Sequence, residues 1–185
     1  MWLRQQSFLR KGHVMSKLAF IFPGQGAQKA GMGKDFYENS EAARSFFDQA
    51  QKILDFDLKE MCFGEHEELN LTEYTQPCMV SVCLAIVQEL KKRGINPDIT
   101  AGLSLGEYGA LIASGAMTMA DAFAVVRKRG IYMQEAVPTG GAMTAVLGLD
   151  PQVIEDICKK TADETNSVVS VANYNCPGQI VITGE

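Results

Sequence analysis

A serine between two glycines is the stretch of this chain best suited to chemistry. Residues 100–111 read TAGLSLGEYGAL, in which Gly102, Ser104 and Gly106 make the pattern GxSxG. Between a strand and a helix, this pattern forms a sharp turn that presents the serine hydroxyl as a nucleophile, and any side chain at either glycine would collide. The backbone N–H of Leu105 would then lie at a helix N-terminus, where it can stabilise an oxyanion. The competing interpretation is a turn of small residues without a chemical role.

A second glycine turn, PGQGAQ at 23–28, directly follows the apolar run KLAFIF at 17–22. In proteins with a nucleophile turn, the loop after such a strand supplies the other oxyanion donor. Gln25 is the candidate for this donor, through its backbone N–H. A plain turn explains the same residues equally well, so only the two glycine turns together favour an active site.

Buried strands must position these two turns. The runs 17–22 and 98–104 are short and almost wholly apolar, as in the strands of a parallel sheet. Between them we expect an apolar helix over 76–93, with Thr75 as its N-cap and Gly94 as its stop. The alternation of strand, turn and helix predicts an α/β fold whose parallel-sheet core is of the α/β-hydrolase type.

The pattern changes at VPTGG, residues 137–141. After this break we expect strand, helix, strand and strand, which is the opening of a split βαβ, or ferredoxin-like, unit. The chain is therefore divided into a basic extension at 1–14, the N-terminal part of a large α/β subdomain at 15–139, and the start of an inserted ferredoxin-like small subdomain at 140–185. Both subdomains should be incomplete, with an unpaired sheet edge and exposed apolar faces.

Charge and cysteine content exclude several classes of function. The chain has 185 residues and a net charge of −5, and its first fourteen residues hold three basic and no acidic side chains, so the rest carries 14 basic minus 22 acidic, or −8. This charge argues against binding to a nucleic-acid backbone. The five cysteines are scattered without a CxxC pair, which favours reduced thiols in a cytosol and predicts neither disulfides nor a metal site.

The chain also lacks the sequence pattern of a membrane protein. Its longest apolar run, MVSVCLAIV at 79–87, is about half of the roughly eighteen residues that a membrane span needs. We expect a cytoplasmic protein. The leader at 1–14 is interpreted as an extension before a natural start at Met15.

Several longer motifs resemble one protein family. In chain order, the stretches FIFPGQGAQ, LTEYTQP, GLSLGEY, RKRGIYMQEAVPTGGAM and NYNCPGQIVITG resemble the malonyl-CoA:acyl carrier protein transacylases of type II fatty acid synthesis, from about Lys17 to Glu185. The resemblance implies that Ser104 takes malonyl from coenzyme A as an ester and passes it to the phosphopantetheine thiol of acyl carrier protein. It implies malonyl-CoA as substrate, acyl carrier protein as partner and no bound cofactor, and we expect a monomer at full length.

The resemblance also assigns roles to residues in the matching motifs. Ser104 is the nucleophile, Gln25 and Leu105 form the oxyanion hole, and Arg129 holds the malonyl carboxylate. A guanidinium suits this last role because it can bind a carboxylate through two parallel hydrogen bonds. The alternative for Arg129 is a solvated basic patch.

Two further residues are weaker candidates for the acyl pocket. Met133, one turn beyond the arginine, could line the pocket or be a core methionine. Asn173 could lie near the site or simply join two strands. Because carrier proteins are acidic, a basic patch made of Arg127, Lys128 and the KKR at 91–93 is a candidate docking surface.

The chain departs from the family pattern in two respects. Leu103 stands before the nucleophile, where the family usually has histidine. More seriously, the family's general base is a histidine further downstream, and the histidines of this chain, His13 and His66, do not match that position. We therefore interpret the chain as the N-terminal portion of a transacylase, with little or no turnover of its own.

Three other functions share these sequence features. A serine thioesterase or hydrolase would use the same turn and oxyanion hole. An acyltransferase domain of a polyketide synthase would share the family motifs. A catalytically inactive module that binds carrier protein would explain the missing base.

Overall fold

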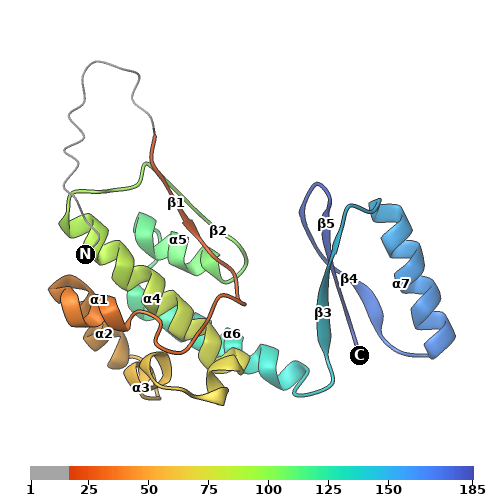
Figure 1. Ribbon diagram of the computed structural model, residues 1–185, viewed down its shortest axis with the longest axis horizontal. Coiled ribbons are helices and arrows are strands. Elements are labelled where there is room, and N and C mark those ends of the chain that lie inside the picture. Colours follow the sequence, from red (N-terminus) through yellow and green to blue (C-terminus); the bar gives the residue numbers. More distant parts are fainter. Residues whose placement is uncertain (1–16) are drawn as a thin grey trace. The chain divides into compact units, whose positions relative to one another are not determined.

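A computed structural model describes residues 17–185, which form two compact units, one up to Tyr132 and one from Met133 to Glu185 (Figure 1). Each unit has its own sheet and its own apolar core. The basic extension at 1–14, with His13, and the proposed start at Met15 lie outside the described residues.

Two parallel strands bring the glycine turns to one sheet edge. Strand β1 (Ala19–Phe22) pairs in parallel with β2 (Ile99–Gly102), and Phe22 lies opposite Gly102 at the end of the register. Because both strands run in the same direction and end together, the loop after β1 and the turn after β2 leave the sheet side by side. The parallel pair confirms the predicted α/β class.

Helices of the first unit enclose the buried side of this strand pair. Phe20 and Phe22 point into the core, while Ala19 and Ile21 alternate outward. The helical segments in chain order are α1 (Lys34–Asn39), α2 (Glu41–Gln51), α3 (Leu58–Phe63), the short 3-10 helix η1 (Glu67–Asn70), α4 (Thr72–Lys92), α5 (Gly106–Ser114) and α6 (Met119–Ala136).

The core of the first unit is built on α4. This helix buries apolar side chains on most of its circumference, among them Cys78 and Leu84, neither of which is exposed. Phe47 of α2 and Phe123 of α6 are also fully buried in the same cluster. Such an all-round apolar helix needs neighbours on several sides, as the sequence predicted.

The predicted N-cap of α4 is wrong by one turn, whereas its predicted stop is confirmed. The helix begins at Thr72, so Thr75 lies inside it, fully buried, and its hydroxyl donates to the carbonyl of Leu69 at 2.6 Å. A threonine inside a helix can satisfy its hydroxyl in this way on a nearby carbonyl, so it need not cap. Gly94 follows the helix with φ of 77°, the left-handed backbone of a helix stop.

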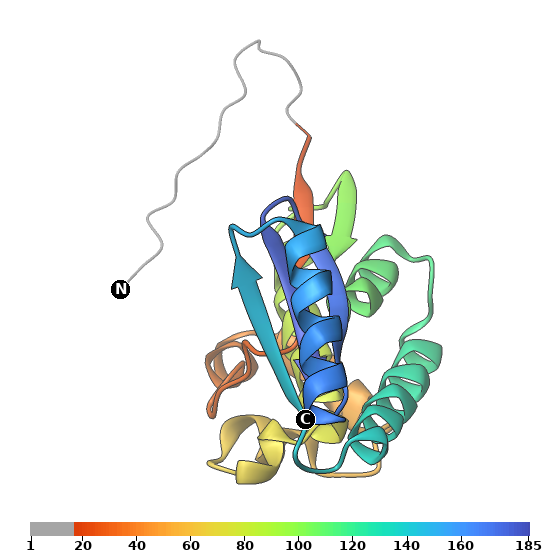
Figure 2. The same cartoon turned by 90° about the vertical axis from the view of Figure 1, so that its right-hand side faces the viewer.

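The second unit is an antiparallel sheet with one helix. Its elements are β3 (Ala142–Leu147), α7 (Pro151–Thr165), β4 (Val169–Cys176) and β5 (Gln179–Gly184), and the strand order is β3-β5-β4. Asp150 caps α7 by accepting from the N–H of Gln152 at 2.9 Å. Figure 2 shows α7 lying across one face of the sheet, where Ile154, Cys158 and Ile180 form a small core. This is the strand order of the first part of a ferredoxin-like unit, as expected.

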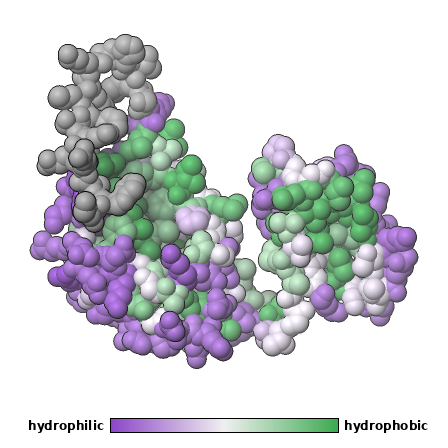
Figure 3. Space-filling view, viewed as in Figure 1, coloured by the Kyte–Doolittle hydropathy of each residue, from purple (hydrophilic) through white to green (hydrophobic). Residues whose placement is uncertain are grey.

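Apolar faces remain uncovered in both units, as the sequence predicted. Ile21 of β1 and Ile99 of β2 are 78% and 52% exposed on the outer face of the parallel pair. Met143 and Leu147 of β3 are similarly exposed in the second unit. Figure 3 shows hydrophobic surface over the strands of each unit. Within the described part of the chain, β1 and β2 pair only with each other, so both have an open edge.

Residues 17–185 contain neither a membrane-spanning helix nor a cluster of metal-binding side chains. No helix in this range combines the length and the apolar character needed to cross a lipid bilayer. The same residues contain no cluster of three or more histidine, cysteine, aspartate or glutamate side chains that could hold a metal ion.

The alternation along β1 predicts that substitutions at two neighbouring residues change the free energy of unfolding by very different amounts. Phe22→Ala removes a ring that is only 4% exposed and should lower the free energy of unfolding by about 3–5 kcal/mol. Ile21→Thr changes an exposed side chain and should alter it by less than about 0.5 kcal/mol. Urea unfolding followed by circular dichroism measures both, and equal destabilisation by the two variants would contradict the described orientation of β1.

Candidate active site

The turn that carries Ser104 has the backbone of a nucleophile turn. Ser104 is exposed and has a φ of 50°, a left-handed conformation that residues other than glycine seldom adopt. A Cβ added to Gly102 would lie 2.1 Å from the backbone of Gly106, and one added to Gly106 would lie 2.3 Å from the carbonyl oxygen of Phe22. Both positions therefore require glycine, as the sequence predicted.

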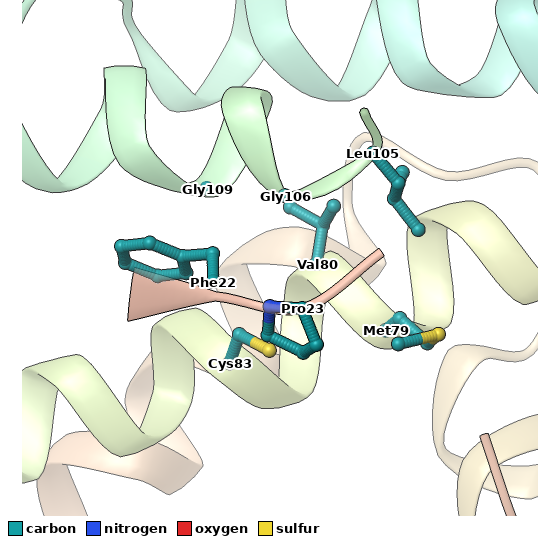
Figure 4. A pocket seen from close by; sticks show the side chains of 8 residues that line it. All are labelled: Phe22, Pro23, Met79, Val80, Cys83, Leu105, Gly106 and Gly109. Carbon is teal, nitrogen blue, oxygen red and sulfur yellow. The ribbon is translucent and has the colours of Figure 1, made fainter. Parts of the chain in front are cut away.

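Helix α5 packs directly on the end of β1. Leu103 donates its backbone N–H to the carbonyl of Phe22 at 3.2 Å, and a Cβ at Gly109 would lie 2.6 Å from the Phe22 ring. Figure 4 shows the apolar gap that remains between β1, α4 and α5. Its volume is about 10 Å³, at the lower limit for one water molecule. Cys83 lines this gap, and because burial raises the pKa of its thiol, it does not compete with the serine as a nucleophile.

Two backbone N–H groups near the serine have no hydrogen-bond acceptor within residues 17–185. One belongs to Leu105, directly after the serine and before the first residue of α5. The other belongs to Gln25, whose loop touches the turn, since a Cβ on Gly24 would lie 3.2 Å from the carbonyl oxygen of Leu103. Both predicted oxyanion donors are thus available to a ligand.

Arg129 brings a cation to the nucleophile. Its Nη2 donates to Oγ of Ser104 at 2.8 Å, and its guanidinium carbon lies 5.8 Å from the centre of the Tyr108 ring. Its Nη1 is buried and has no hydrogen-bond partner among the residues that the structure describes. A buried donor without a partner costs about 1–3 kcal/mol, so an anion bound here would recover that free energy. The alternative of a solvated basic patch does not account for this buried nitrogen.

Two contacts with the first turn of α4 fix the direction of Arg129. Pro77 has no N–H, so the carbonyl of Glu73, four residues earlier, lacks its helical donor, and Nη1 of Arg127 donates to it at 2.9 Å. Gly130 allows the helices to meet, because a Cβ there would lie 2.8 Å from the Cα of Glu73. These contacts are made two residues before and one residue after Arg129, and they hold its segment of α6 in place.

Arg127 is structural, so its assignment to a carrier-protein docking patch is wrong. Its side chain is only 15% exposed, with Nε 2.7 Å from Oδ1 of Asp55 and Nη1 2.9 Å from Oε2 of Glu73. The hydrogen bond from Arg127 holds the pKa of Asp55 below its ordinary value. The pair therefore stabilises the fold at neutral pH and is lost only as the pH falls through the acidic range of the carboxylate.

The basic run at 91–93 is also engaged in contacts. Lys91 donates to the carbonyl of Ala113, and the other two residues form ion pairs with glutamates on the same or a neighbouring helix. Lys128 is exposed and makes none of these contacts, so it remains a candidate for the docking surface.

No histidine among the described residues contacts the serine. His66 lies 2.9 Å from Oε1 of Glu60, and Arg129 is the hydrogen-bond partner of the serine hydroxyl within residues 17–185. Because a guanidinium does not give up its proton in proteins, Arg129 cannot act as a base. Within residues 17–185, no side chain that could act as a general base contacts the hydroxyl of Ser104.

The two weaker pocket candidates belong to the second unit. Met133 is in α6, and Asn173 is in β4 opposite Val181 of β5, at an irregularity in the strand register. Their assignment to the acyl pocket stays a prediction.

A left-handed serine turn at the end of parallel strands is the geometry of serine-dependent α/β acyl-transfer proteins, and here a half-buried arginine lies at the hydroxyl. The comparison with known families gives the particular family within this class. The chain belongs to the family described as "Acyl transferase domain", whose model matches residues 19–185.

Individual relatives agree with this assignment. The malonyl CoA-acyl carrier protein transacylase of Bacillus subtilis (strain 168) is 51% identical over 172 residues, which are 92% of this chain and 54% of that protein. The crystal structure of the transacylase of the same name from Clostridium perfringens has a TM-score of 0.81 and 47% identity, and covers 92% of this chain and 54% of that one. The chain spans about half the length of the curated relatives it matches.

A third relative was solved with its partner. It is a malonyl-transacylase in complex with a type II polyketide synthase acyl-carrier protein, with a TM-score of 0.81 and 41% identity, covering 92% of this chain and 55% of that one.

The sequence patterns did not indicate the residues that support the candidate site without contacting Ser104. Thr72 and Gln76 bond to the side chain of Gln25, and Arg127 joins α6 to α4. The available signal was Pro77 inside an otherwise strong helical pattern, because an internal proline leaves one carbonyl for another donor.

The close packing of the serine turn predicts a large difference between two glycine substitutions. Gly106→Ala places a Cβ against backbone and should cost more than about 3 kcal/mol of unfolding free energy. Gly115→Ala meets no atom within 4 Å and should cost about 1–2 kcal/mol through its positive φ alone. Urea unfolding measures both values, and a Gly106→Ala variant as stable as Gly115→Ala would contradict the described turn.

Proposed function

We propose that the chain supplies the nucleophile, the oxyanion hole and the substrate anchor of a malonyl-CoA:acyl carrier protein transacylase. One observation carries this proposal. Arg129 donates from Nη2 to Oγ of Ser104, while its buried Nη1 has no partner among the described residues. A dicarboxylic acyl group such as malonyl has a free carboxylate close to the reacting carbonyl. This carboxylate would accept a hydrogen bond from Nη1 of Arg129 as Ser104 attacks the carbonyl.

The reaction proceeds in two transfers at one oxygen. In the first, hydroxide takes the proton of Ser104, Oγ bonds to the thioester carbonyl carbon, and the negative charge that develops on the carbonyl oxygen is stabilised by the N–H groups of Gln25 and Leu105. The carbon–sulfur bond then breaks, coenzyme A leaves as a thiolate that takes a proton from water, and a seryl ester remains. In the second, the phosphopantetheine thiol loses its proton, its sulfur bonds to the ester carbonyl carbon, the carbon–Oγ bond breaks, and Oγ takes up a proton.

Arg129 favours transfer of a charged acyl group over the other functions considered. A hydrolase of neutral esters has no use for a buried cation at the nucleophile, whereas a guanidinium forms two charge-assisted hydrogen bonds with a carboxylate. The ring of Tyr108 stabilises the Arg129 cation further when no substrate carboxylate is bound.

The partner we propose is acyl carrier protein, in the cytoplasm and with no bound cofactor. The relative solved with a carrier protein supports the choice of partner. A monomer at full length and the use of Lys128 in docking are parts of the same proposal.

Substrate preference tests the role of Arg129. Ser104 should be acylated by malonyl-CoA at least about tenfold faster than by acetyl-CoA, because one charge-assisted hydrogen bond contributes about 1.5–3 kcal/mol. Arg129→Ala and Arg129→Lys should both lose most of this preference, since lysine cannot form the bidentate pair. Mass spectrometry of the labelled chain over time measures the rates.

The matched control is Lys128→Ala, which removes a neighbouring positive charge that makes no contact with the serine. It should keep the malonyl preference. Equal labelling by the two thioesters, or a preference that survives Arg129→Ala, would overturn the carboxylate-anchor proposal.

The absence of a base among the described residues predicts an unusual pH dependence. The rate of Ser104 acylation by malonyl-CoA should be low at neutral pH and should rise about tenfold per pH unit between about pH 6 and 9, because hydroxide must remove the proton. A rate that reaches a plateau at neutral pH would contradict this and indicate that a side chain of the chain acts as the base.

A further inference from the structure

The side chain of Gln25 is held at both ends by α4. Its Oε1 accepts from Nε2 of Gln76 at 3.2 Å, and its Nε2 donates to Oγ1 of Thr72 at 3.3 Å. Thr72 and Gln76 are four residues apart, so they lie one above the other on the same face of the helix. One face of the first turns of α4 thus forms hydrogen bonds with the side-chain amide of Gln25, whose backbone N–H is a proposed oxyanion donor.

These two hydrogen bonds matter because the residues on either side of Gln25 restrain its backbone little. Gln25 is exposed and lies between Gly24 and Gly26, and Gly26 has a φ of 116°. Glycine has fewer steric restraints than other residues, so hydrogen bonds contribute more to the direction of the Gln25 N–H. One of them lies within the loop, where the Gly26 N–H donates to Oε1 of Gln28 at 2.9 Å. Beyond the Gln25 amide, the loop has one further side-chain tether to this region, from Gln28 to Asn70 at 3.3 Å.

Gln76 is one of three fully buried polar residues of α4, with Thr75 and Ser81, and its side chain is the longest of them. Its side chain is fully buried, and its helical neighbours Cys78, Met79 and Val80 are apolar and belong to the core. A buried amide is stabilising only when it is hydrogen-bonded, whereas an apolar residue of similar size would carry no such requirement. The Nε2 of this amide meets the requirement through its bond to Gln25, which connects the core of α4 to the loop after β1.

The helix that bears Gln76 is itself fixed relative to the proposed carboxylate anchor. The carbonyl of Glu73 binds Arg127, and Gly130 abuts the same turn of α4. The first turns of α4 consequently contact both the loop of Gln25 and the segment of Arg129.

We propose that Gln76 is a positioning residue, which fixes the amide of Gln25 and thereby aims the Gln25 N–H at the developing oxyanion. This inference rests on the proposed function, because it presupposes that the N–H of Gln25 serves Ser104. Gln76 itself touches no reacting atom. It acts on the transition state and not on the binding of the substrate carboxylate.

The test compares two buried polar residues of α4. Gln76→Leu removes the bond to Gln25 at similar volume, and Thr75→Val removes a buried hydroxyl that bonds only within the helix and its approach. With malonyl-CoA, Gln76→Leu should slow Ser104 acylation about 10–100-fold, somewhat less than the loss of a whole oxyanion donor. Protection of Ser104 by free malonate, which reports on Arg129, should change by less than about twofold. Thr75→Val should lower thermal stability without this loss of rate.

A second variant covers the case in which Gln76→Leu does not fold. Gln25→Leu breaks the same bond from the exposed side of the contact and also removes the bond to Thr72, so it should slow acylation by at least as much. The double variant should be no slower than Gln25→Leu alone, since that variant has already lost the bond between the two amides. Additive losses, an unchanged rate in Gln76→Leu, or a parallel fall in rate and malonate protection would overturn the positioning role.

A neutral probe separates this inference from the proposed function. p-Nitrophenyl acetate also develops an oxyanion when it acylates Ser104, but it carries no carboxylate for Arg129. If malonyl-CoA shows no preference while Gln76→Leu still slows labelling by p-nitrophenyl acetate, the malonyl proposal fails and the positioning role stands. If neither reagent labels Ser104 in the wild-type chain even at about pH 9, where hydroxide replaces the missing base, the proposed function and the positioning role are both overturned.

Discussion

The backbone contact between α5 and the end of β1 is the constraint on which the rest of the site depends. Gly106 lies so close to the carbonyl of Phe22 that no Cβ fits between them, and Gly102 is equally close to the start of α5. With helix and strand this near, the chain can join them only through a left-handed residue, which is Ser104. The exposure of the serine and the free N–H of Leu105 both follow from that geometry.

The first turns of α4 impose a second constraint, because they contact both the loop of Gln25 and helix α6. An internal proline leaves the carbonyl of Glu73 to Arg127, and a glycine of α6 meets the same turn. The same turns carry the amide of Gln76, which bonds to Gln25. One short helical segment thus sets the distance between two groups that must act on the same acyl unit, the oxyanion donor and the cation.

The parts of the site that are local in sequence could be predicted from it, and the parts that depend on long-range pairing could not. The GLSLG turn, the PGQGAQ loop and the requirement for two glycines follow from strand-to-helix geometry, and the structure has all three. The structural role of Arg127 was missed because Asp55, its ion-pair partner, lies 72 residues away. Thr75 was mistaken for a cap because a buried hydroxyl bonded to nearby carbonyls looks the same in sequence as one that starts a helix. The roles of Gln25, Leu105 and Arg129 remain predictions that the geometry supports.

The most direct test of the central claim, that one acyl group is held by the oxyanion donors and Arg129 at once, is a crystal structure of the chain after reaction with malonyl-CoA. The account predicts an ester on Oγ of Ser104 whose carbonyl oxygen lies within about 3.1 Å of the backbone nitrogens of Gln25 and Leu105. It also predicts the free carboxylate on Nη1 and Nη2 of Arg129. An ester whose carboxylate points to solvent, with Nη1 still unpartnered, would contradict it.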